Sequence, residues 1–456
     1  MKKFAVVLML LAVVAISLSA VSAQDVTIPT ELPEGITIQY MHEWDGAQAE
    51  AINQIIANFN ETNEYGITVE TIEMGSSGPM RDAISAGIVS GELPDLVGGF
   101  ANDAQGWFLD GVVVPFDPYI TDATWGLTEE EQANLIPEVF AVNRVDSEPF
   151  NGQLLAWPIG YSAVVLSVNT DLTAELGLEG APETLEQFRE VACGAAELTN
   201  ASGGDVQGFP LRTNPQDMEA FILSQGGRVW DPETMQFDFD NEQAIEVLTF
   251  FQQLVADGCA YVPDGPFVNT ADFAYSLNPM AVGSSVGVPF IRGDAQAATD
   301  AGQTGVTNWV NTTTPWSEGN RTLILNFRSV VMLASTPEEQ LATWLFVKHF
   351  ASDESQNIWT TMTLYQPNTF SGLEALDETF LSENPQFTSV RDLILDESVR
   401  KVGDPQMIGW FNAFNEAFGG LITTIATDPT ADVAAAAAEA ETLANELLAE
   451  AQSALE

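Results

Sequence analysis

Residues 36–70 read ITIQYMHEWDGAQAEAINQIIANFNETNEYGITVE and contain the signals of a strand, a helix and a second strand. Apolar side chains alternate over 36–40, and a second short alternating run covers 67–72, as is typical of strands. Between them, apolar residues follow the i, i+3, i+4, i+7 spacing of one helix face: Ile52, Ile55, Ile56 and Phe59. A strand–helix–strand unit with this spacing favours two parallel strands covered by the helix.

The same mixture of helix and strand signals continues along the chain. A helix and a strand are predicted within 80–100, with Gly91 and Pro94 separating them, and a strand within 152–169. The run TLILNFRSVVMLA at 322–334 is typical of a nearly continuous buried strand, and 431–452 of a terminal helix. No internal repeat or low-complexity linker divides the chain. Two α/β lobes without a single linker predict a chain that crosses between the lobes more than once.

Helix starts are marked by capping sequences. Thr184 is followed three residues later by Gln187, and Thr336 by Pro337 and then Glu339, the pattern of a capping box. These signals predict helices that begin just after Thr184 and Thr336.

The first residues are typical of a signal peptide, predicted over 1–23. Lys2 and Lys3 precede an apolar core at 4–18, and Val21-Ser22-Ala23 before Gln24 fits a cleavage site. A retained membrane anchor would need a longer apolar core. No cysteine lies near the cleavage site, so no lipid anchor is predicted. The mature protein is expected to be soluble and to work in the periplasm or outside the cell.

The composition bounds the partners. The chain has 65 acidic and 14 basic residues and a net charge of −51, which disfavours nucleic acid and anionic membranes as partners. Its 456 residues, 46% of them hydrophobic, suffice for two cores. The strong acidity is consistent with solubility, including in a saline habitat.

The two cysteines, Cys193 and Cys259, invite a disulfide in an oxidising compartment, with two buried free thiols as the alternative. Two cysteines and two histidines are too few for a zinc site, and neither a metal nor a cofactor is expected.

Taken together, these segments resemble the family-1 extracellular solute-binding proteins, which include the maltose- and multiple-sugar-binding proteins of ABC importers. The segments that carry the resemblance are 36–70, 86–97 (AGIVSGELPDLV), 150–172, 181–192, 223–258, 280–290 (MAVGSSVGVPF), 335–359, 365–369 (YQPNT) and the terminal helix.

The resemblance implies a periplasmic-binding-protein-like α/β fold, with two lobes, a multi-stranded hinge and a ligand cleft between the lobes. Lobe one would comprise 24–158 and 325–366, and lobe two 159–324 and 367–456. The protein would be a monomer that closes on a sugar and delivers it to the membrane subunits of an importer.

A sugar site needs aromatic faces and planar polar groups, and clefts of α/β sheets lie at the carboxyl ends of strands. At the end of the first strand, Glu43 is a candidate acceptor and Trp44 a candidate stacking ring, although Trp44 could instead pack on its own helix at the surface. Ser76, after the second strand, is a candidate donor or part of a plain loop.

The resemblance adds further candidates. Asn102 and Asp103 occupy the place of a polar pair, and Tyr161 and Ser162 follow the first crossing between lobes. Gly99 stands where the family has an aromatic residue, so stacking there would fall to Phe100.

In the second lobe, Arg212 and Asn214, with Gln216, precede a contact-bearing segment. Ser285 and its neighbour Ser284 remain as contacts where Val286 replaces the usual aromatic residue, which argues against a maltose-like specificity.

Two aromatic candidates lie later in the chain. Trp410 matches a stacking tryptophan of relatives, with a core role as the alternative. Tyr365 lies near the last crossing, as a hinge or cleft residue.

Other functions compete with sugar capture. The run Gly283–Gly287 matches G-x-S-x-G, so a serine hydrolase with Ser285 and His349 is an alternative, but His349 falls within a predicted helix rather than on a loop. The same fold could bind a polyol or a glycerophosphodiester, with Arg212 and Arg292 as the first phosphate candidates. An acidic adhesion protein would predict β-rich repeats, which the sequence lacks.

Overall fold

The predicted strand–helix–strand unit is present in the computed structural model, which describes residues 26–145, 149–265 and 267–453. Strands β1 (Thr37–His42) and β2 (Thr68–Glu73) are parallel and flank helix α1 (Gly46–Thr62). The apolar stripe of α1 is buried, as its spacing predicts. The predicted signal peptide at 1–23 lies outside the described residues.

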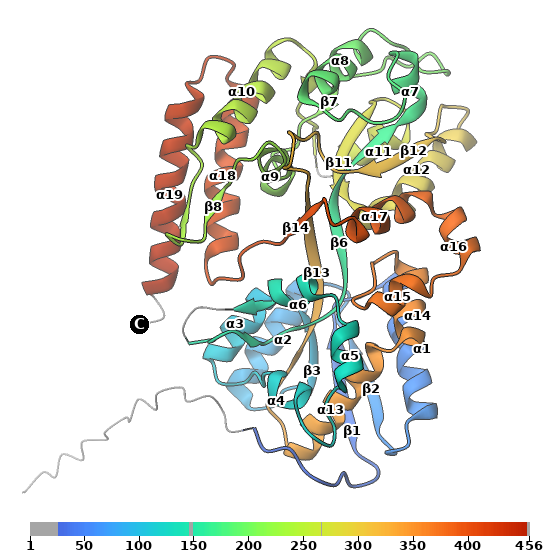
Figure 1. The fold of residues 1–456 in the computed structure, drawn as a ribbon, viewed down its shortest axis with the longest axis vertical. Coiled ribbons are helices and arrows are strands. Elements are labelled where there is room, and N and C mark those ends of the chain that lie inside the picture. The colour runs from blue at the N-terminus through green and yellow to red at the C-terminus, as the bar shows by residue number, and fades with distance from the viewer. Residues whose placement is uncertain (1–25, 146–148, 266, 454–456) are drawn as a thin grey trace, which may run out of the picture.

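Two long strands connect the two lobes of the molecule (Figure 1). In the main sheet the strand order is β11-β6-β13-β3-β1-β2, with β12 also paired to β6 and β14 to β13. The long strands β6 (Trp157–Asn169) and β13 (Thr322–Met332) are antiparallel partners. The second half of β6 pairs with β11 (Met280–Ser284) and β12 (Trp309–Thr312). The end of β13 pairs with β3 (Leu96–Gly99), and its start with β14 (Arg400–Val402).

Lobe one has a core on each face of its sheet, because successive strand residues point to opposite faces. Val330 and Met332 of β13 pack with α1 and α13 (Pro337–Phe350) on one face. Val331 of the same strand packs with α2 (Ser77–Ser90) and α3 (Ala101–Leu109) on the other. Both faces of these strands are buried, which explains their nearly continuous apolar sequence.

Lobe two is built around the other half of β6. Val164, Leu166 and Val168 pack against a core from α8 (Leu185–Ala195), α9 (Pro215–Ser224), α10 (Glu242–Ala256), α18 (Trp410–Thr427) and α19 (Val433–Ser453). A smaller cluster from α11 (Val268–Ala274), α12 (Val288–Asp300) and Trp309 of β12 covers the opposite face of β11. Thus β6 contributes to both main cores. The lobe boundaries at 158/159, 324/325 and 366/367 stay predictions.

Several local predictions are confirmed. Thr184 and Thr336 accept hydrogen bonds from the amides of Gln187 and Glu339, so both capping boxes are formed. Cys193 of α8 and Cys259 form a disulfide. Their Cα atoms are 4.3 Å apart, and their sequence separation is 66.

The remaining elements complete the two lobes. The short strands are β4 (Arg144–Val145), β5 (Gln153–Leu154), β7 (Phe209–Pro210), β8 (Trp230–Asp231), β9 (Gln236–Phe237) and β10 (Ala260–Tyr261). The other helices are α4 (Asp117–Ile120), α5 (Glu129–Asn134), α6 (Pro137–Val142), α7 (Thr170–Glu175), α14 (Asp353–Thr363), α15 (Phe370–Glu374), α16 (Glu378–Glu383), α17 (Pro385–Leu395) and the 3₁₀ turn Ser285–Gly287. None of the helices in the described part of the chain has the length and hydropathy needed to cross a bilayer.

Candidate functional site

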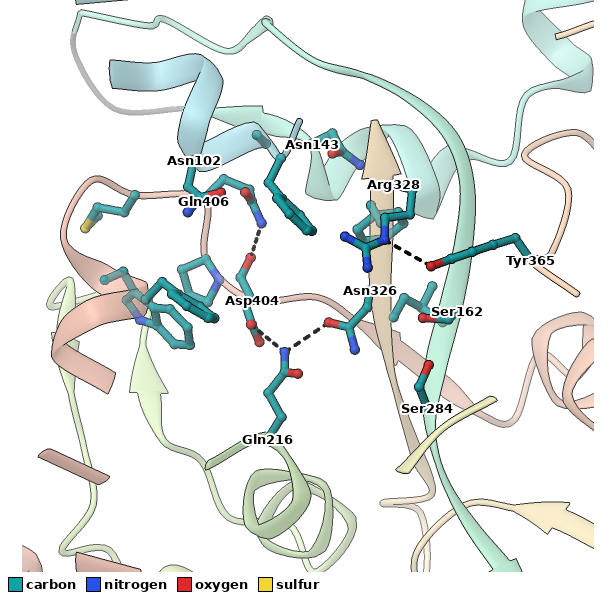
Figure 2. A pocket seen from close by; sticks show the side chains of 18 of the residues that line it. Asn102, Asn143, Ser162, Gln216, Ser284, Asn326, Arg328, Tyr365, Asp404 and Gln406 are labelled. Atoms are coloured by element: carbon teal, nitrogen blue, oxygen red, sulfur yellow. Dashed lines mark hydrogen bonds between the residues drawn. The ribbon is translucent and has the colours of Figure 1, made fainter. Parts of the chain in front are cut away.

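A cavity of about 430 Å³ lies where β6 and β13 pass between the lobes. Its walls come from both lobes, and Figure 2 shows polar side chains from several elements directed toward one another. The residues that line it are Arg81, Phe100, Ala101, Asn102, Asn143, Ser162, Gln216, Ser284, Val286, Leu325, Asn326, Phe327, Arg328, Tyr365, Asp404, Pro405, Gln406, Met407, Trp410 and Phe411.

One wall is organised around Asp404, which lies in the loop between β14 and α18. Gln216, at the start of α9, donates from Nε2 to Asp404 Oδ2 at 2.6 Å and to Asn326 Oδ1 at 3.0 Å. The side chain of Gln406 donates to the backbone carbonyl of Asp404 at 2.9 Å, which holds the loop (Figure 2). The other carboxyl oxygen, Asp404 Oδ1, is buried and has no hydrogen-bond partner. It is therefore an acceptor available to a ligand.

A second carboxyl group stands beside Asp404. Glu219 lies one turn after Gln216 on α9, is 6% exposed, and has a buried Oε2 without a partner. Burial raises the pKa of Asp404 to about 6. Burial, reinforced by the charge of Asp404, raises the pKa of Glu219 well above its usual range.

The opposite wall is positively charged. The guanidinium of Arg328, on β13, lies 4.7 Å from the centre of the Phe100 ring and 5.4 Å from that of Trp44. Its Nε donates to the Tyr365 hydroxyl at 3.0 Å. Cation–π contacts with two rings and one hydrogen bond hold Arg328 at the cavity (Figure 2).

A second arginine on this wall is paired. Arg81 forms an ion pair with Asp103 at 2.8 Å, and the hydrogen bond that it donates to Asp103 raises the pKa of Arg81.

Aromatic rings at the start of α18 form a further part of the wall. Trp410 packs against Phe237 and Phe414, and its buried Nε1 has no acceptor. Phe411 is 50% exposed, so its ring is open to an incoming molecule. Rings beside planar amide, carboxylate and guanidinium groups can hold a polyhydroxylated ring through its apolar face and its hydroxyls.

The structure brings four of the main sequence candidates to this cavity, Asn102, Ser162, Tyr365 and Trp410, and with them Phe100, Gln216 and Ser284, which the sequence also indicated. Trp410 lines the cavity and also belongs to the core of lobe two. Its position therefore agrees with both the ligand-contact prediction and the core alternative. Contact with a ligand stays a prediction for all four.

Three other candidates lie behind the cavity wall. Trp44 is buried, packs edge-on against Trp359 and Tyr365, and supports Arg328, so the alternative of a surface tryptophan was wrong, and its stacking on a ligand stays a prediction. Asp103 holds Arg81. Tyr161 is fully buried in the core of lobe one.

Glu43 is buried too, and its carboxyl group lies against the backbone of Gly98, where any larger residue would collide with it. Burial raises the pKa of Glu43, and the positive charge of Arg328 opposes this shift. Glu43 is not part of the cavity lining.

The remaining candidates do not line the cavity either. Ser76 is exposed at the start of α2, and Asn214 caps α9 by accepting from the Asp217 amide at 3.4 Å. Arg212 forms a bidentate ion pair with Asp217. Asn214 and Arg212 therefore already serve local structure, whereas the Ser76 side chain does not cap α2.

Ser285 does not meet His349 in the way a hydrolase requires. The strand–turn–helix motif around Ser285 exists, but its hydroxyl is buried and accepts a hydrogen bond from the Ala163 amide at 3.0 Å. His349 lies on α13 and packs against Phe59. No hydrogen bond joins the two side chains within the described residues. Ser284, the neighbour of Ser285, lines the cavity instead.

Sequence reasoning missed Arg328, Asn326 and Asp404. Asn326 and Arg328 are polar residues two positions apart in an otherwise apolar strand, a signal that was present in the sequence. Asp404 carries no such signal, because it is one of 65 acidic residues.

Comparison with known protein families agrees with this architecture. Residues 54–388 match the family described as bacterial extracellular solute-binding protein. The chain belongs to this family. Its members are solute-binding proteins, and the cavity between the lobes of this member is its candidate solute site.

Solved structures share the fold at low sequence identity. The cyclic α-maltosyl-1,6-maltose binding protein of Arthrobacter globiformis is 15% identical, with a TM-score of 0.73 and coverage of 91% of this chain and 99% of that one. The sugar-binding protein MalE of Xanthomonas citri is 17% identical, with a TM-score of 0.73 and coverage of 92% and 98%. UgpB of Mycobacterium tuberculosis, solved with glycerophosphocholine, is 16% identical, with a TM-score of 0.71 and coverage of 91% and 99%. No curated protein matches the chain.

Proposed function

We propose that this protein captures a carbohydrate in the cavity between its lobes and delivers it to an ABC importer. The observation that carries the proposal is the cavity lining, in which Trp410 and Phe411 lie beside the polar groups of Asn326 and Asp404. Stacking surfaces next to planar hydrogen-bonding groups suit the two chemical faces of a sugar ring. Two of the structural neighbours are sugar-binding proteins by name, which supports the same ligand class.

Binding would proceed by closure of the lobes about β6 and β13. Asn102 belongs to lobe one and Gln216 to lobe two, and both line the cavity. A solute that contacts both walls stabilises the closed form relative to the open one. The closed form would then be the one that the membrane subunits of the importer recognise, in the periplasm or at the outer face of the cell. A monomer suffices for this role, and no catalytic step is part of it.

The experiment is a thermal-shift screen of the mature protein against mono- and oligosaccharides, polyols, glycerophosphodiesters, amino acids and peptides. A ligand at 100 times its Kd should add about 2.7 kcal/mol of stability. A sugar that raises Tm supports the proposal, and a screen in which only non-sugars do so contradicts the ligand class.

A pair of exposed phenylalanines provides a matched test of the site. Phe411 lines the cavity and is 50% exposed, whereas Phe290 on α12 is 73% exposed and lies outside the lining. Because neither ring is buried, neither substitution should unfold the protein. Phe411→Ala should weaken sugar binding, and Phe290→Ala should not. Equal affinities in the two variants would remove the α18 wall from the site.

A glycerophosphodiester is the second candidate ligand, and Arg328 with Arg81 in the lining favours it. The two arginines first considered for a phosphate are engaged elsewhere. Arg212 pairs with Asp217, and Arg292 bonds to Asn384 and Gln386. A phosphodiester that outcompetes every sugar in the screen, with binding lost in Arg328→Gln, would favour this candidate.

A further inference from the structure

The carboxyl pair at the cavity, Asp404 and Glu219, lacks the partners that buried acids normally have. Asp404 Oδ1 and Glu219 Oε2 are both buried and accept no hydrogen bond. Among the residues that the structure describes, the one side chain that donates a hydrogen bond to the pair is Gln216, whose Nε2 bonds to Asp404 Oδ2. Buried polar side-chain atoms usually have at least one hydrogen-bond partner, because an unsatisfied buried charge is costly. Two acceptor oxygens are thus unfilled, one on Asp404 in the cavity lining and one on Glu219 next to it.

In the described part of the chain, no basic side chain forms an ion pair with either of these two groups. Among the ion pairs of the described residues, none includes Asp404 or Glu219. Arg328 on β13 and Arg81 on α2 belong to the opposite wall, where Tyr365 and Asp103 engage them.

Two other arginines bind residues of α9, but among the described residues neither is paired with Asp404 or Glu219. Arg212 is held by Asp217, and Arg400 of β14 donates to the Leu223 carbonyl. The charge of the pair therefore remains uncompensated by side chains on α9, β13 and β14.

We propose that the solute of this protein carries a protonated amine, which binds at Asp404 with Glu219 behind it. The proposal rests on the proposed function and narrows its ligand class from sugars to amino sugars. An ammonium group supplies both the hydrogen-bond donors that Asp404 Oδ1 lacks and the positive charge that the pair lacks. A neutral hydroxyl supplies a donor but no charge.

Two neighbouring features suit the same group. Trp410 and Phe411 line the cavity within one turn of α18, shortly after Asp404 in the chain, and an ammonium group is attracted to aromatic faces. The net charge of −51 favours the approach of a cationic solute over an anionic one.

In the empty protein one carboxyl group of the pair would carry a proton near pH 6, which explains how two carboxyl groups coexist in this environment. The raised pKa values of both groups agree with this arrangement. A bound ammonium group would replace that proton. Binding of an amine should consequently release protons near pH 6, whereas binding of a neutral sugar should not.

The test is isothermal titration calorimetry with matched sets of sugars at pH 7. Each set contains an amino sugar, its N-acetyl derivative and its neutral parent. The amino sugars are glucosamine, galactosamine and mannosamine. A disaccharide set compares chitobiose in its free-amine form with cellobiose. In at least one set the amine should bind ten times more tightly than its neutral parent, which is about 1.4 kcal/mol. Neutral members that bind as tightly as the amines in every set would overturn the inference but leave the proposed function standing. If no sugar binds, both fall.

Variants then locate the amine. Asp404→Asn keeps the shape of the side chain and should abolish the preference, so that each amine binds no more tightly than its neutral parent. Glu397→Gln removes one exposed acidic charge outside the cavity and should leave the preference intact. An equal loss in both variants would assign the preference to the overall field of the protein and overturn the site.

If Asp404→Asn fails to fold, Glu219→Gln takes its place in the calorimetric comparison. The wild type provides a second measurement that needs no variant. Titration of the wild type in buffers of different ionisation enthalpy at pH 6 measures proton release directly. Proton release on binding of the amine supports replacement of the proton on the carboxyl pair. Binding of the amine without proton release contradicts that replacement.

Discussion

Asp404→Asn should make the protein more stable near neutral pH, although it alters the solute cavity. Raising the pKa of Asp404 from 3.8 to about 6 reflects the cost of ionising its carboxyl group in the folded protein. Since one pK unit corresponds to about 1.4 kcal/mol, the ionised group destabilises the fold by about 3 kcal/mol. An amide cannot ionise, so the variant avoids this cost.

The sign of the pH dependence follows from the direction of the shift. Because the folded pKa lies above the unfolded one, the folded protein binds the proton more tightly, and stability falls as pH rises from 3.8 to about 6. The advantage of Asp404→Asn should accordingly be small at pH 4 and approach its full value above pH 7. The pKa of Glu219 is raised in the same direction, and loss of the neighbouring charge would relax it too.

Urea denaturation followed by tryptophan fluorescence, at several pH values between 4 and 8, measures the difference between the two proteins. Glu397→Gln serves as the control for loss of one exposed charge. A variant that is less stable than the wild type at pH 8, or a difference that does not change with pH, would refute the reasoning.

Three further perturbations have defined outcomes. Trp410→Ala should weaken binding by at least about 1 kcal/mol and destabilise lobe two by about 3–5 kcal/mol, so affinity is measured on protein shown to be folded by circular dichroism; unchanged affinity would remove Trp410 from the site. Reduction of the disulfide of α8 should cost about 4 kcal/mol, and unreduced denatured protein should show no reactive thiol. Gly160→Ala would bring a methyl group within 2.5 Å of Trp359 Nε1, whereas Gly283→Ala meets nothing within 4 Å. Only the first should lower the free energy of unfolding, by about 1–3 kcal/mol. Urea denaturation measures this difference.

The elements of the fold could be predicted where the signal is local. The spacing of apolar residues in 52–59 and the capping boxes at Thr184 and Thr336 depend on neighbours within one or two turns, and the structure confirms them. The disulfide required only two cysteines and an oxidising compartment.

The site was less accessible to sequence reasoning, because it depends on contacts between distant segments. Trp44 follows a strand at the expected edge, but the rings of Trp359 and Tyr365 bury it, and these lie more than 300 positions away. Arg212 would suit a phosphate, but it is already paired with Asp217 in the first turn of α9. Asp404 lies in a loop and is brought next to Gln216 and Glu219 of α9 only by the fold. No periodicity in the sequence indicates this contact.

The two connecting strands also carry part of the candidate solute site. Ser162 lies on β6, and Asn326 and Arg328 lie on β13. Under the proposed function, a substitution at any of these three positions would alter solute contacts and the bending stiffness of the joint at once. Selection for a new solute would proceed more freely through 100–103 at the start of α3 and through 404–411, the loop that leads into α18 together with the start of that helix, where a changed side chain leaves the joint intact. A sensor engineer would, for the same reason, change these two segments to alter specificity and the strands to alter the signal.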